Sequence, residues 1–456
     1  MVFSSLFFIF FFLPVFFVLY YIVPSKFKNL ILLIFSLLFY SWGEPIYILI
    51  LLFSSLVDYT NGFFINKYKD NKLKKKIFLI ISIIVNLSLL GIFKYSNFII
   101  SNLSLVGFHL KSPNIALPLG ISFFTFQTMS YSIDVYLGNI KYEKNFINFM
   151  TYVSMFPQLV AGPIVRYSDI SKELNKRTLS FSNFSDGVFK FLTGLFKKVL
   201  IANNMGLIFN LITHDINGIS LSTAWVGSLS FAFQIYFDFS GYSDMAIGLG
   251  KMMGFNYPEN FNYPYIAKSI TDFWRRWHIT LSIWFRDYVY IPLGGNRCSK
   301  KRQIFNMFVV WFLTGLWHGA SWNFIIWGLY FFILLVIEKY IISKISIPDI
   351  IRRLIFIFLI LISWVIFAFD DINVLITYLS KMFINKNIID NTTIFYFKNY
   401  FIFFVSAFIF STPIIKKIKR TKIIDSLIVI IYLILFIITV ASLVGDSYNP
   451  FLYFRF

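Results

Sequence analysis

MVFSSLFFIFFFLPVFFVLYYIV (residues 1–23) contains no charged side chain, and its length suffices for one helical crossing of a bilayer, which takes about 20 apolar residues. Its first cations, Lys26 and Lys28, follow the apolar stretch, whereas a secretory signal is preceded by positive charge and ends in a cleavage site of small residues. We therefore expect a permanent membrane helix here. Similar stretches recur along the chain, at 29–42, 44–65, 77–94, 117–137, 146–165, 186–212, 222–252, 304–317, 321–341, 351–369, 396–414 and 424–444.

The composition of the 456-residue chain agrees with this pattern. Hydrophobic residues make up 58% of it and charged residues 14%, whereas an ordinary soluble domain is about 45–50% apolar and about 25% charged. A soluble globule exposes too much surface to hide so many Phe and Ile side chains. The sequence therefore predicts an all-α polytopic membrane protein with about ten to twelve transmembrane or re-entrant helices, because several stretches are too short or too polar to cross alone.

The distribution of positive charge along the sequence predicts how the chain is oriented in the membrane. An excess of 41 Lys and Arg over 21 Asp and Glu gives a formal charge of +20. In so apolar a chain we expect these cations to face the membrane lipids of the cytoplasmic side rather than a nucleic acid. The densest basic runs, 67–76 and 416–422, should be cytoplasmic, and counting spans outward from them places both termini outside the cytoplasm. We expect a single domain over 1–456, with outside loops at 95–116 and 370–395.

A run of charged and aromatic side chains, TDFWRRWHITLSIWFRDYVYIPLGGNR (271–297), interrupts the apolar pattern. It is too charged to cross lipid alone, so it should line a protein interior, a water-filled cavity or the membrane interface. An interfacial helix with arginines on lipid headgroups is the plain alternative, but such an anchor needs neither Asp272 nor His278. If the run is one helix, one face holds Trp274, Trp277, His278, Leu281 and Phe285.

A second polar group lies in the apolar stretch WFLTGLWHGASWNFIIWGLYF (311–331), where His318 follows Trp317 and precedes Asn323. A titratable group at membrane depth is costly and is a functional candidate by default, although a lone histidine is also often a satisfied structural hydrogen-bond donor. Two of the four histidines of the chain lie in these two aromatic segments, which favours function. A neutral imidazole can take a proton from a hydroxyl that attacks an activated acyl group.

The sequence lacks the residue patterns of disulfide-bonded, metal-binding, serine-hydrolase and nucleotide-binding sites. A single cysteine, Cys298, excludes a disulfide framework, and two histidines without a Cys or carboxylate cluster make a poor metal site. The chain has no G-x-S-x-G elbow and no phosphate-binding P-loop. Cys298 lies in a basic loop, but we expect an incidental thiol there. We therefore expect no bound metal and no bound cofactor.

The central half of the chain contains four long motifs. They are FPQLVAGPIVRYSDI (156–170), DFSGYSDMAIGLGKMMGFNYPENFNYPY (238–265), DFWRRWHITLSIWFRDYVYIPLGGNR (272–297) and GLWHGASWNF (315–324). These motifs resemble the membrane-bound O-acyltransferase family, in particular its bacterial alginate O-acetyltransferase-like branch. The resemblance implies a ring of helices around a central tunnel, a motif-bearing catalytic core at about 117–341, a catalytic role for His318 and a supporting role for His278.

The resemblance also implies a function: O-acetylation of an extracytoplasmic polysaccharide or cell-wall glycan at the bacterial plasma membrane. Acetyl-CoA would be the donor substrate on the cytoplasmic side, His318 the general base, and an extracytoplasmic SGNH-type acetyltransferase the partner that completes the transfer. Lys197 and Lys198 are among the further cations that could hold donor phosphates. The residues expected to contact the donor or substrate are Asp272, Trp274, Arg275, Arg276, Arg286, Trp317 and Asn323.

Two alternatives stay open at this point. D-alanyl transfer to teichoic acid belongs to the same family and differs in its donor. A transporter of an acylated or lipid-linked species would use the buried polar groups as a path without chemistry, and its expected mark is helices broken by Gly or Pro in matching halves of the chain. The sequence shows no such symmetry. The final acceptor and the oligomeric state are left open.

Overall fold

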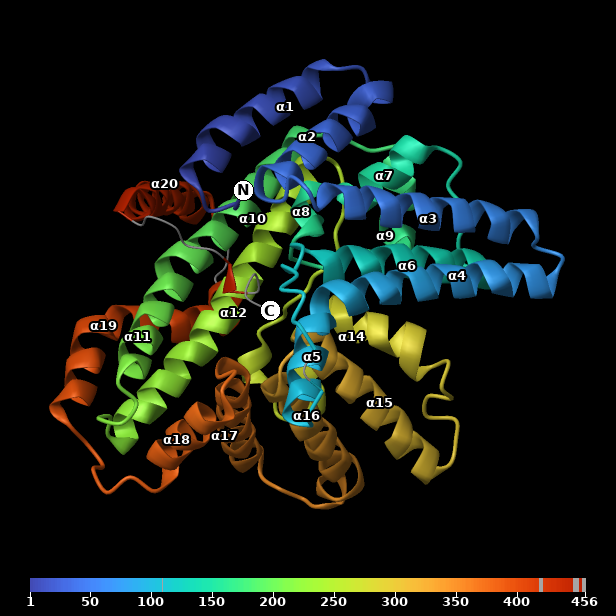
Figure 1. The fold of residues 1–456 in the computed structure, drawn as a ribbon. Helices are drawn as coiled ribbons and strands as arrows, with labels where there is room; N and C mark the ends of the chain where they lie inside the picture. Colours follow the sequence, from blue (N-terminus) through green and yellow to red (C-terminus); the bar gives the residue numbers. More distant parts are fainter. Residues whose placement is uncertain (109, 418–420, 446–450, 453–456) are drawn as a thin grey trace. The chain divides into compact units, whose positions relative to one another are not determined.

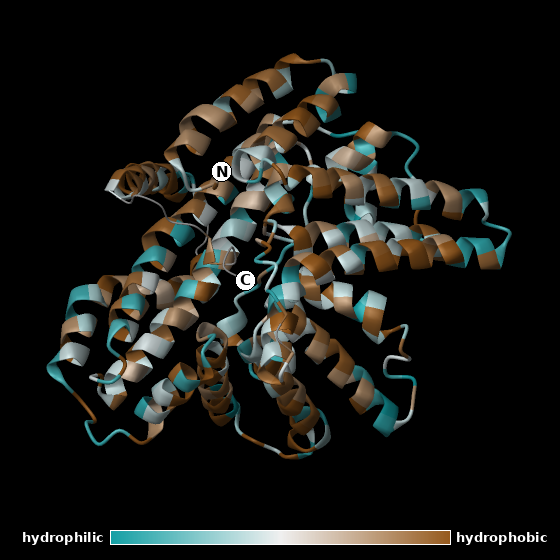
Figure 2. Ribbon diagram, viewed as in Figure 1, coloured by the Kyte–Doolittle hydropathy of each residue, from teal (hydrophilic) through white to brown (hydrophobic). Residues whose placement is uncertain are grey.

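The computed structural model describes residues 1–108, 110–417, 421–445 and 451–452, and throughout this part of the chain the regular elements are helices. The all-α prediction is confirmed. Hydrophobic residues predominate along many of the helices, and several connections between helices are hydrophilic (Figure 2). The described helical segments that are long and apolar enough to cross a membrane are Ile48–Lys67, Lys72–Leu105, Phe181–His214, Trp322–Lys344, Asp349–Ala368, Asn391–Phe410 and Lys422–Gly445.

The chain divides into two compact units. The first comprises Met1–Phe191 and Ser243–Glu259, and the second Leu192–Tyr242 and Asn260–Phe456. Two helices, α10 (Phe181–Phe196) and α12 (Leu221–Met252), run from one unit into the other. The other helices of the first unit are η1 (Phe8–Phe12), α1 (Leu13–Ile22), η2 (Ser25–Phe27), α2 (Lys28–Gly43), α3 (Ile48–Lys67), α4 (Lys72–Leu90), η3 (Gly91–Tyr95), α5 (Ser96–Leu105), α6 (Ile121–Leu137), α7 (Phe146–Ser154), α8 (Phe156–Leu159) and α9 (Tyr167–Asn175).

Helices α3, α4 and α6 of the first unit lie side by side (Figure 1) and share a buried polar network. Its centre is the fully buried carboxylate of Asp58 on α3. Asn86 Nδ2 on α4 and Ser132 Oγ on α6 donate to its two oxygens at 2.6 and 2.7 Å. Because an intramembrane carboxylate must find its partners inside the protein, this network fixes the register of the three helices.

The second unit is built around aromatic side chains. Trp277, Trp327 and Trp364 are fully buried, and the Trp277 and Trp364 rings lie 4.7 Å apart, centroid to centroid. The helices of this unit, beyond its parts of α10 and α12, are η4 (Lys197–Ala202), α11 (Asn203–His214), η5 (Pro264–Ile266), α13 (Ile270–Trp274), α14 (Ile279–Phe285), η6 (Arg286–Tyr290), α15 (Lys300–His318), α16 (Trp322–Tyr340), η7 (Ile342–Lys344), α17 (Asp349–Ala368), α18 (Ile372–Phe383), α19 (Asn391–Phe410), η8 (Ile415–Lys417) and α20 (Lys422–Gly445).

Three sequence expectations differ from the observed elements. The stretch 146–165 is not one span, because α7 ends before Met155 and the short α8 begins with Pro157 in its first turn, where a missing N–H is tolerated. The expected outside loops 95–116 and 370–395 contain the helices α5 and α18. The composition of these stretches did not predict them. Of the basic run at 416–422, Lys419 and Arg420 lie outside the described residues.

Candidate active site

The segment around His278 is not the continuous helix expected from the sequence. Helix α13 ends at Trp274, and α14 begins only after His278, whose φ of 43° lies in the left-handed region. Two backbone hydrogen bonds hold this break, from the N–H of Asn262 to the carbonyl of Arg276 and from the N–H of Ile279 to the carbonyl of Asn260, at 2.9 and 3.0 Å. The prediction that residues 274–285 share one helical face is therefore wrong, because the chain turns at His278.

The turn buries His278 completely and leaves it one polar neighbour in the described structure. Its Nδ1 lies 3.1 Å from Oδ1 of Asn260, and this oxygen also accepts a hydrogen bond from the hydroxyl of Thr280 at 2.9 Å. Because Oδ1 is an acceptor, the hydrogen-bond network assigns the ring proton to Nδ1. The Nε2 atom then carries the lone pair, and no described group donates a hydrogen bond to it.

Burial also sets the charge of this ring. His278 lies outside the candidate spanning helices, and desolvation lowers the pKa of its imidazole from the usual value to about 3. The ring is therefore neutral at physiological pH and can accept a proton or a hydrogen bond at Nε2.

His318 is the last residue of α15 and is 3% exposed. Three aromatic rings meet it edge-on: Trp327 at 4.9 Å, Trp317 at 5.1 Å and Phe367 at 5.4 Å between centroids. The Trp317 ring also contacts His278, at 5.7 Å. The structure thus brings the two predicted histidines to one shared indole, although they are 40 positions apart in the sequence.

Asn323 supports His318 indirectly, through a neighbouring residue. It is fully buried near the start of α16, and its Nδ2 donates to the carbonyl of Phe367 at 3.1 Å. This bond fixes the end of α17, whose Phe367 ring packs against His318. Asn323 therefore supports the aromatic cage of His318 through Phe367.

A cavity of about 580 Å³ lies beside this cage in the second unit. Three of the residues expected to contact the donor, Trp274, Arg275 and Arg286, line it, together with Lys339. Thr314, one helical turn before His318 on α15, also lines it. Trp274 packs at 5.7 Å against Trp327, and Trp327 contacts His318. The cavity is therefore lined by cations and is separated from the His318 ring by the contact between Trp274 and Trp327.

Asp272 and Arg276 lie elsewhere. Arg276 Nε donates to Asp272 Oδ1 at 2.8 Å, and neither residue lines the cavity. Lys198 pairs with Asp238 as a buried ion pair. Arg276 and Lys198 are thus each paired with a carboxylate of the chain, and neither lines this cavity.

The sequence left two groups near His278 unassigned. Asn260 lies inside the motif 238–265, but a pattern gives no reason to pair it with a residue 18 positions later. Phe239, from the same motif, meets the His278 ring at 4.7 Å and Phe451 at 5.7 Å. The N–H of Leu452 donates to Asp238 Oδ2 at 2.7 Å, so the described residues 451–452 pack against the part of α12 that contacts the histidine.

Comparisons with known proteins agree with the motifs. The sequence model of the membrane-bound O-acyltransferase family matches residues 38–381. A probable alginate O-acetylase AlgI of Pseudomonas aeruginosa is 42% identical over 382 residues, which cover 82% of this chain and 73% of the relative. A peptidoglycan O-acetyltransferase of Helicobacter pylori is 41% identical over 362 residues, covering 72% and 68%. A teichoic acid D-alanyltransferase of Bacillus subtilis is 33% identical over 243 residues, covering 50% and 60%.

Proposed function

The chain belongs to the membrane-bound O-acyltransferase family, and from this premise we propose that it transfers an acetyl group from acetyl-CoA to a hydroxyl group for O-acetylation of an extracytoplasmic polysaccharide or cell-wall glycan. It is a multi-pass membrane acyltransferase. The proposed site is the pair His278 and His318 about Trp317, together with the adjoining cavity. The observation that supports it most is that this cavity is lined by cations and shares a wall residue, Trp274, that packs against Trp327 of the His318 cage.

The names of the relatives support acetyl over D-alanyl transfer. The alginate and peptidoglycan O-acetyltransferases match a larger share of the chain at higher identity than the teichoic acid D-alanyltransferase does. An acceptor outside the cytoplasm requires transfer across or at the plasma membrane, and an SGNH-type enzyme outside it would be the partner that receives the acetyl group.

The rim of the cavity suits the anionic end of the donor. Arg275 offers a planar guanidinium group and Lys339 an ammonium, and both groups form charge-assisted hydrogen bonds with phosphates. Arg286 pairs through Nε with Asp287 at 2.7 Å, so it would reach a phosphate with its other guanidinium N–H groups. Glu338 also lines this cavity, but its carboxylate already accepts the N–H groups of Ile270 and Thr271 at 2.6 and 3.1 Å. The rim therefore favours a polyanion, and the thioester would lie deeper, toward Thr314.

In the proposed reaction, His318 takes the proton of the acceptor hydroxyl as its oxygen attacks the acetyl carbonyl carbon. A C–O bond forms, the C–S bond of the thioester breaks, and the proton passes to the departing thiolate. His278 orients the reacting groups through the lone pair on Nε2, since its Nδ1–H is bound to Asn260. General-base catalysis of this kind contributes about 10²- to 10⁴-fold in rate.

The test is an assay of acetyl transfer from radiolabelled acetyl-CoA by the purified protein after it is reconstituted into membranes. We expect His318→Ala to lose about 10²- to 10⁴-fold in rate while inserting normally. His214→Ala, an exposed histidine at the end of α11, is the matched control and should keep full activity. A normal rate for His318→Ala would refute the assignment. Transfer from a D-alanyl carrier but not from acetyl-CoA would replace acetyl by D-alanyl.

A further inference from the structure

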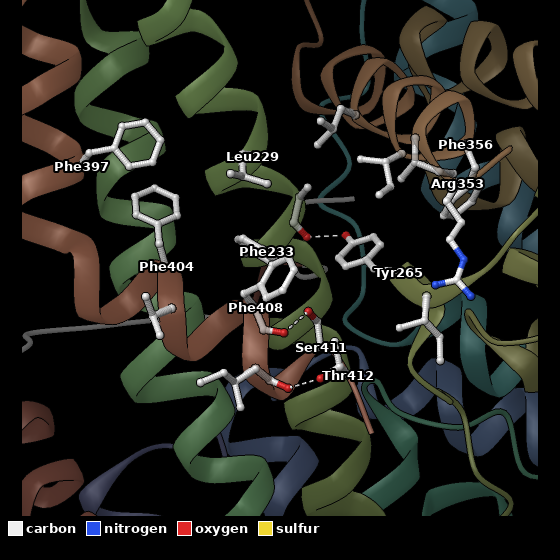
Figure 3. Close-up of a pocket in the computed structure, with 17 residues that line it drawn as sticks. Leu229, Phe233, Tyr265, Arg353, Phe356, Phe397, Phe404, Phe408, Ser411 and Thr412 are labelled. Carbon is white, nitrogen blue, oxygen red and sulfur yellow. Dashed lines mark hydrogen bonds between the residues drawn. The ribbon is translucent and has the colours of Figure 1, made fainter. Parts of the chain in front are cut away.

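A second cavity of the same unit lies between α12, α17 and α19, and its volume is about 570 Å³, within the range of roughly 300–1,000 Å³ typical of ligand sites. Figure 3 shows its walls. They consist of apolar side chains, among them Phe233, Phe356, Ile360, Phe404 and Phe408. No lining residue is shared with the cavity beside His318.

The hydroxyl groups of this cavity are already engaged with the backbone. Tyr265 donates to the carbonyl of Ala232 at 2.5 Å, and Ser411 and Thr412 donate to the helical carbonyls three residues before them. The interior therefore offers no free hydroxyl proton to a ligand. A group that fills it must be hydrocarbon, since a polar group there would lose its hydrogen bonds to water without replacement.

One end of the cavity is basic. Arg353 is the one charged residue among those that line it, and Figure 3 shows it on the side opposite Phe397, with Ser411 and Thr412 between the two in this view. Lys416, four residues after Thr412, lies 5.2 Å over the ring of Tyr263.

The nearby carboxylate is outnumbered by cations. Asp349, at the start of α17, pairs with Lys268 and also interacts electrostatically with Arg353 and Arg352. The cavity thus combines a hydrocarbon interior with a positively charged mouth.

We propose that this cavity binds an acyl chain of an anionic phospholipid, with the lipid phosphate held at Arg353 and Lys416. A free phosphate would leave the interior unfilled, and a neutral lipid would not use the basic mouth. Basic pockets between membrane helices on the cytoplasmic side are typical anionic-lipid sites. This inference does not depend on the reaction proposed above.

Photo-crosslinking of the full chain in phosphatidylcholine nanodiscs tests the proposal, using a trace of phosphatidylglycerol with a photoreactive acyl chain. We expect crosslinks on α17 and α19, and fewer with the matching phosphatidylcholine probe. Arg353→Gln should lower the phosphatidylglycerol yield about five-fold, the effect of one cation at an anionic headgroup. Lys398→Gln, on α19 toward the Phe397 end, removes the same charge and should leave the yield unchanged.

A second pair of variants tests the cavity itself. Val405→Trp would fill it and should abolish crosslinking, whereas Phe401→Trp, at an exposed position outside the lining of the same helix, should not. Equal yields with both probes, or an unchanged yield in Arg353→Gln, would overturn the proposal. If Val405→Trp fails to fold, the comparison of Arg353→Gln with Lys398→Gln decides.

Discussion

His278 depends on one residue for its orientation. Asn260 Oδ1 accepts from the imidazole and from Thr280, so removing it frees the ring to rotate and to change tautomer. We expect Asn260→Ala to lower kcat about ten-fold, the worth of roughly one hydrogen bond, and to leave KM for acetyl-CoA nearly unchanged. Steady-state kinetics would separate the two constants.

The conservative variant distinguishes positioning from loss of structure. Asn260→Asp keeps the acceptor oxygen, so activity should recover relative to Asn260→Ala. Its carboxylate also favours the imidazolium and should raise the pKa of His278, moving the acidic limb of the kcat profile to higher pH. Equal rates for both variants at every pH would show that Asn260 has only a structural role.

The depressed pKa of His278 predicts a pH-dependent stability. Folding holds the ring neutral down to a pKa of about 3, whereas the unfolded chain binds a proton below the ordinary histidine pKa of about 6.5. Stability should therefore be complete above this value and should fall as the pH drops toward 3, by about 2 kcal/mol at pH 5. Thermal unfolding in detergent at pH 7 and pH 5 measures the difference, and His278→Gln should lose less stability between the two pH values than the unaltered chain does.

The two histidines could be found from the sequence because titratable groups are rare in so apolar a chain. Their supporting residues could not be assigned in the same way. Asn260 was one of many polar residues in its motif, and only the turn that ends at His278 places it beside the ring. Arg276 resembled Arg275 in sequence, but the structure pairs it with Asp272 and leaves Arg275 at the cavity.

At the level of helices, the position of His318 depends on the close packing of α15 against α16, which glycine residues allow. A Cβ atom on Gly328 of α16 would lie 2.4 Å from the carbonyl oxygen of Trp311 and 3.2 Å from Cα of Gly315, both on α15. The two backbones are therefore in direct contact, as small residues allow in membrane helices.

We expect Gly328→Ala to force these helices apart and to destabilise the protein by about 1–3 kcal/mol, the usual cost of overpacking. The shift of α15 should also lower the acetyl-transfer rate. Gly91→Ala is the matched control, because nothing lies within 4 Å of a Cβ atom there. Thermal unfolding and activity of both variants test this, and an unperturbed Gly328→Ala would contradict the close packing.

Long apolar helices could be predicted from the sequence because hydrocarbon length and composition determine them. The breaks within them could not. The left-handed residue at His278 depends on backbone hydrogen bonds to Asn260 and Asn262, which periodicity does not reveal. Helices α5 and α18 could not be predicted as separate spans either, because α5 continues the helical segment that begins at Lys72 and α18 has only 12 residues.

For the molecule as a whole, the helix bounds keep the basic segments consistent with one orientation. If the apolar helices each cross once, the segments that precede α2, separate α3 from α4, and follow α6 lie on one side of the membrane. The start of α17 and the end of α19 also share one side if the 12-residue α18, which is too short to span a bilayer, does not cross. By the positive-inside rule we expect these sides to be cytoplasmic, and both termini then to lie outside.

The single cysteine permits a direct test of this topology. In a Cys298→Ser background, Lys74→Cys at the start of α4 and Leu105→Cys at the end of α5 mark opposite ends of one continuous 34-residue helical segment. A membrane-impermeant maleimide should label Leu105→Cys, an 84% exposed position, in intact cells and Lys74→Cys in inverted vesicles.

A phosphatase fused after Phe456 should be active outside, because the last span leads away from the basic run at 416–422. The reversed labelling pattern, or cytoplasmic fluorescence from a reporter at the same position, would invert the orientation, and the basic rim beside His318 would then face away from cytoplasmic acetyl-CoA.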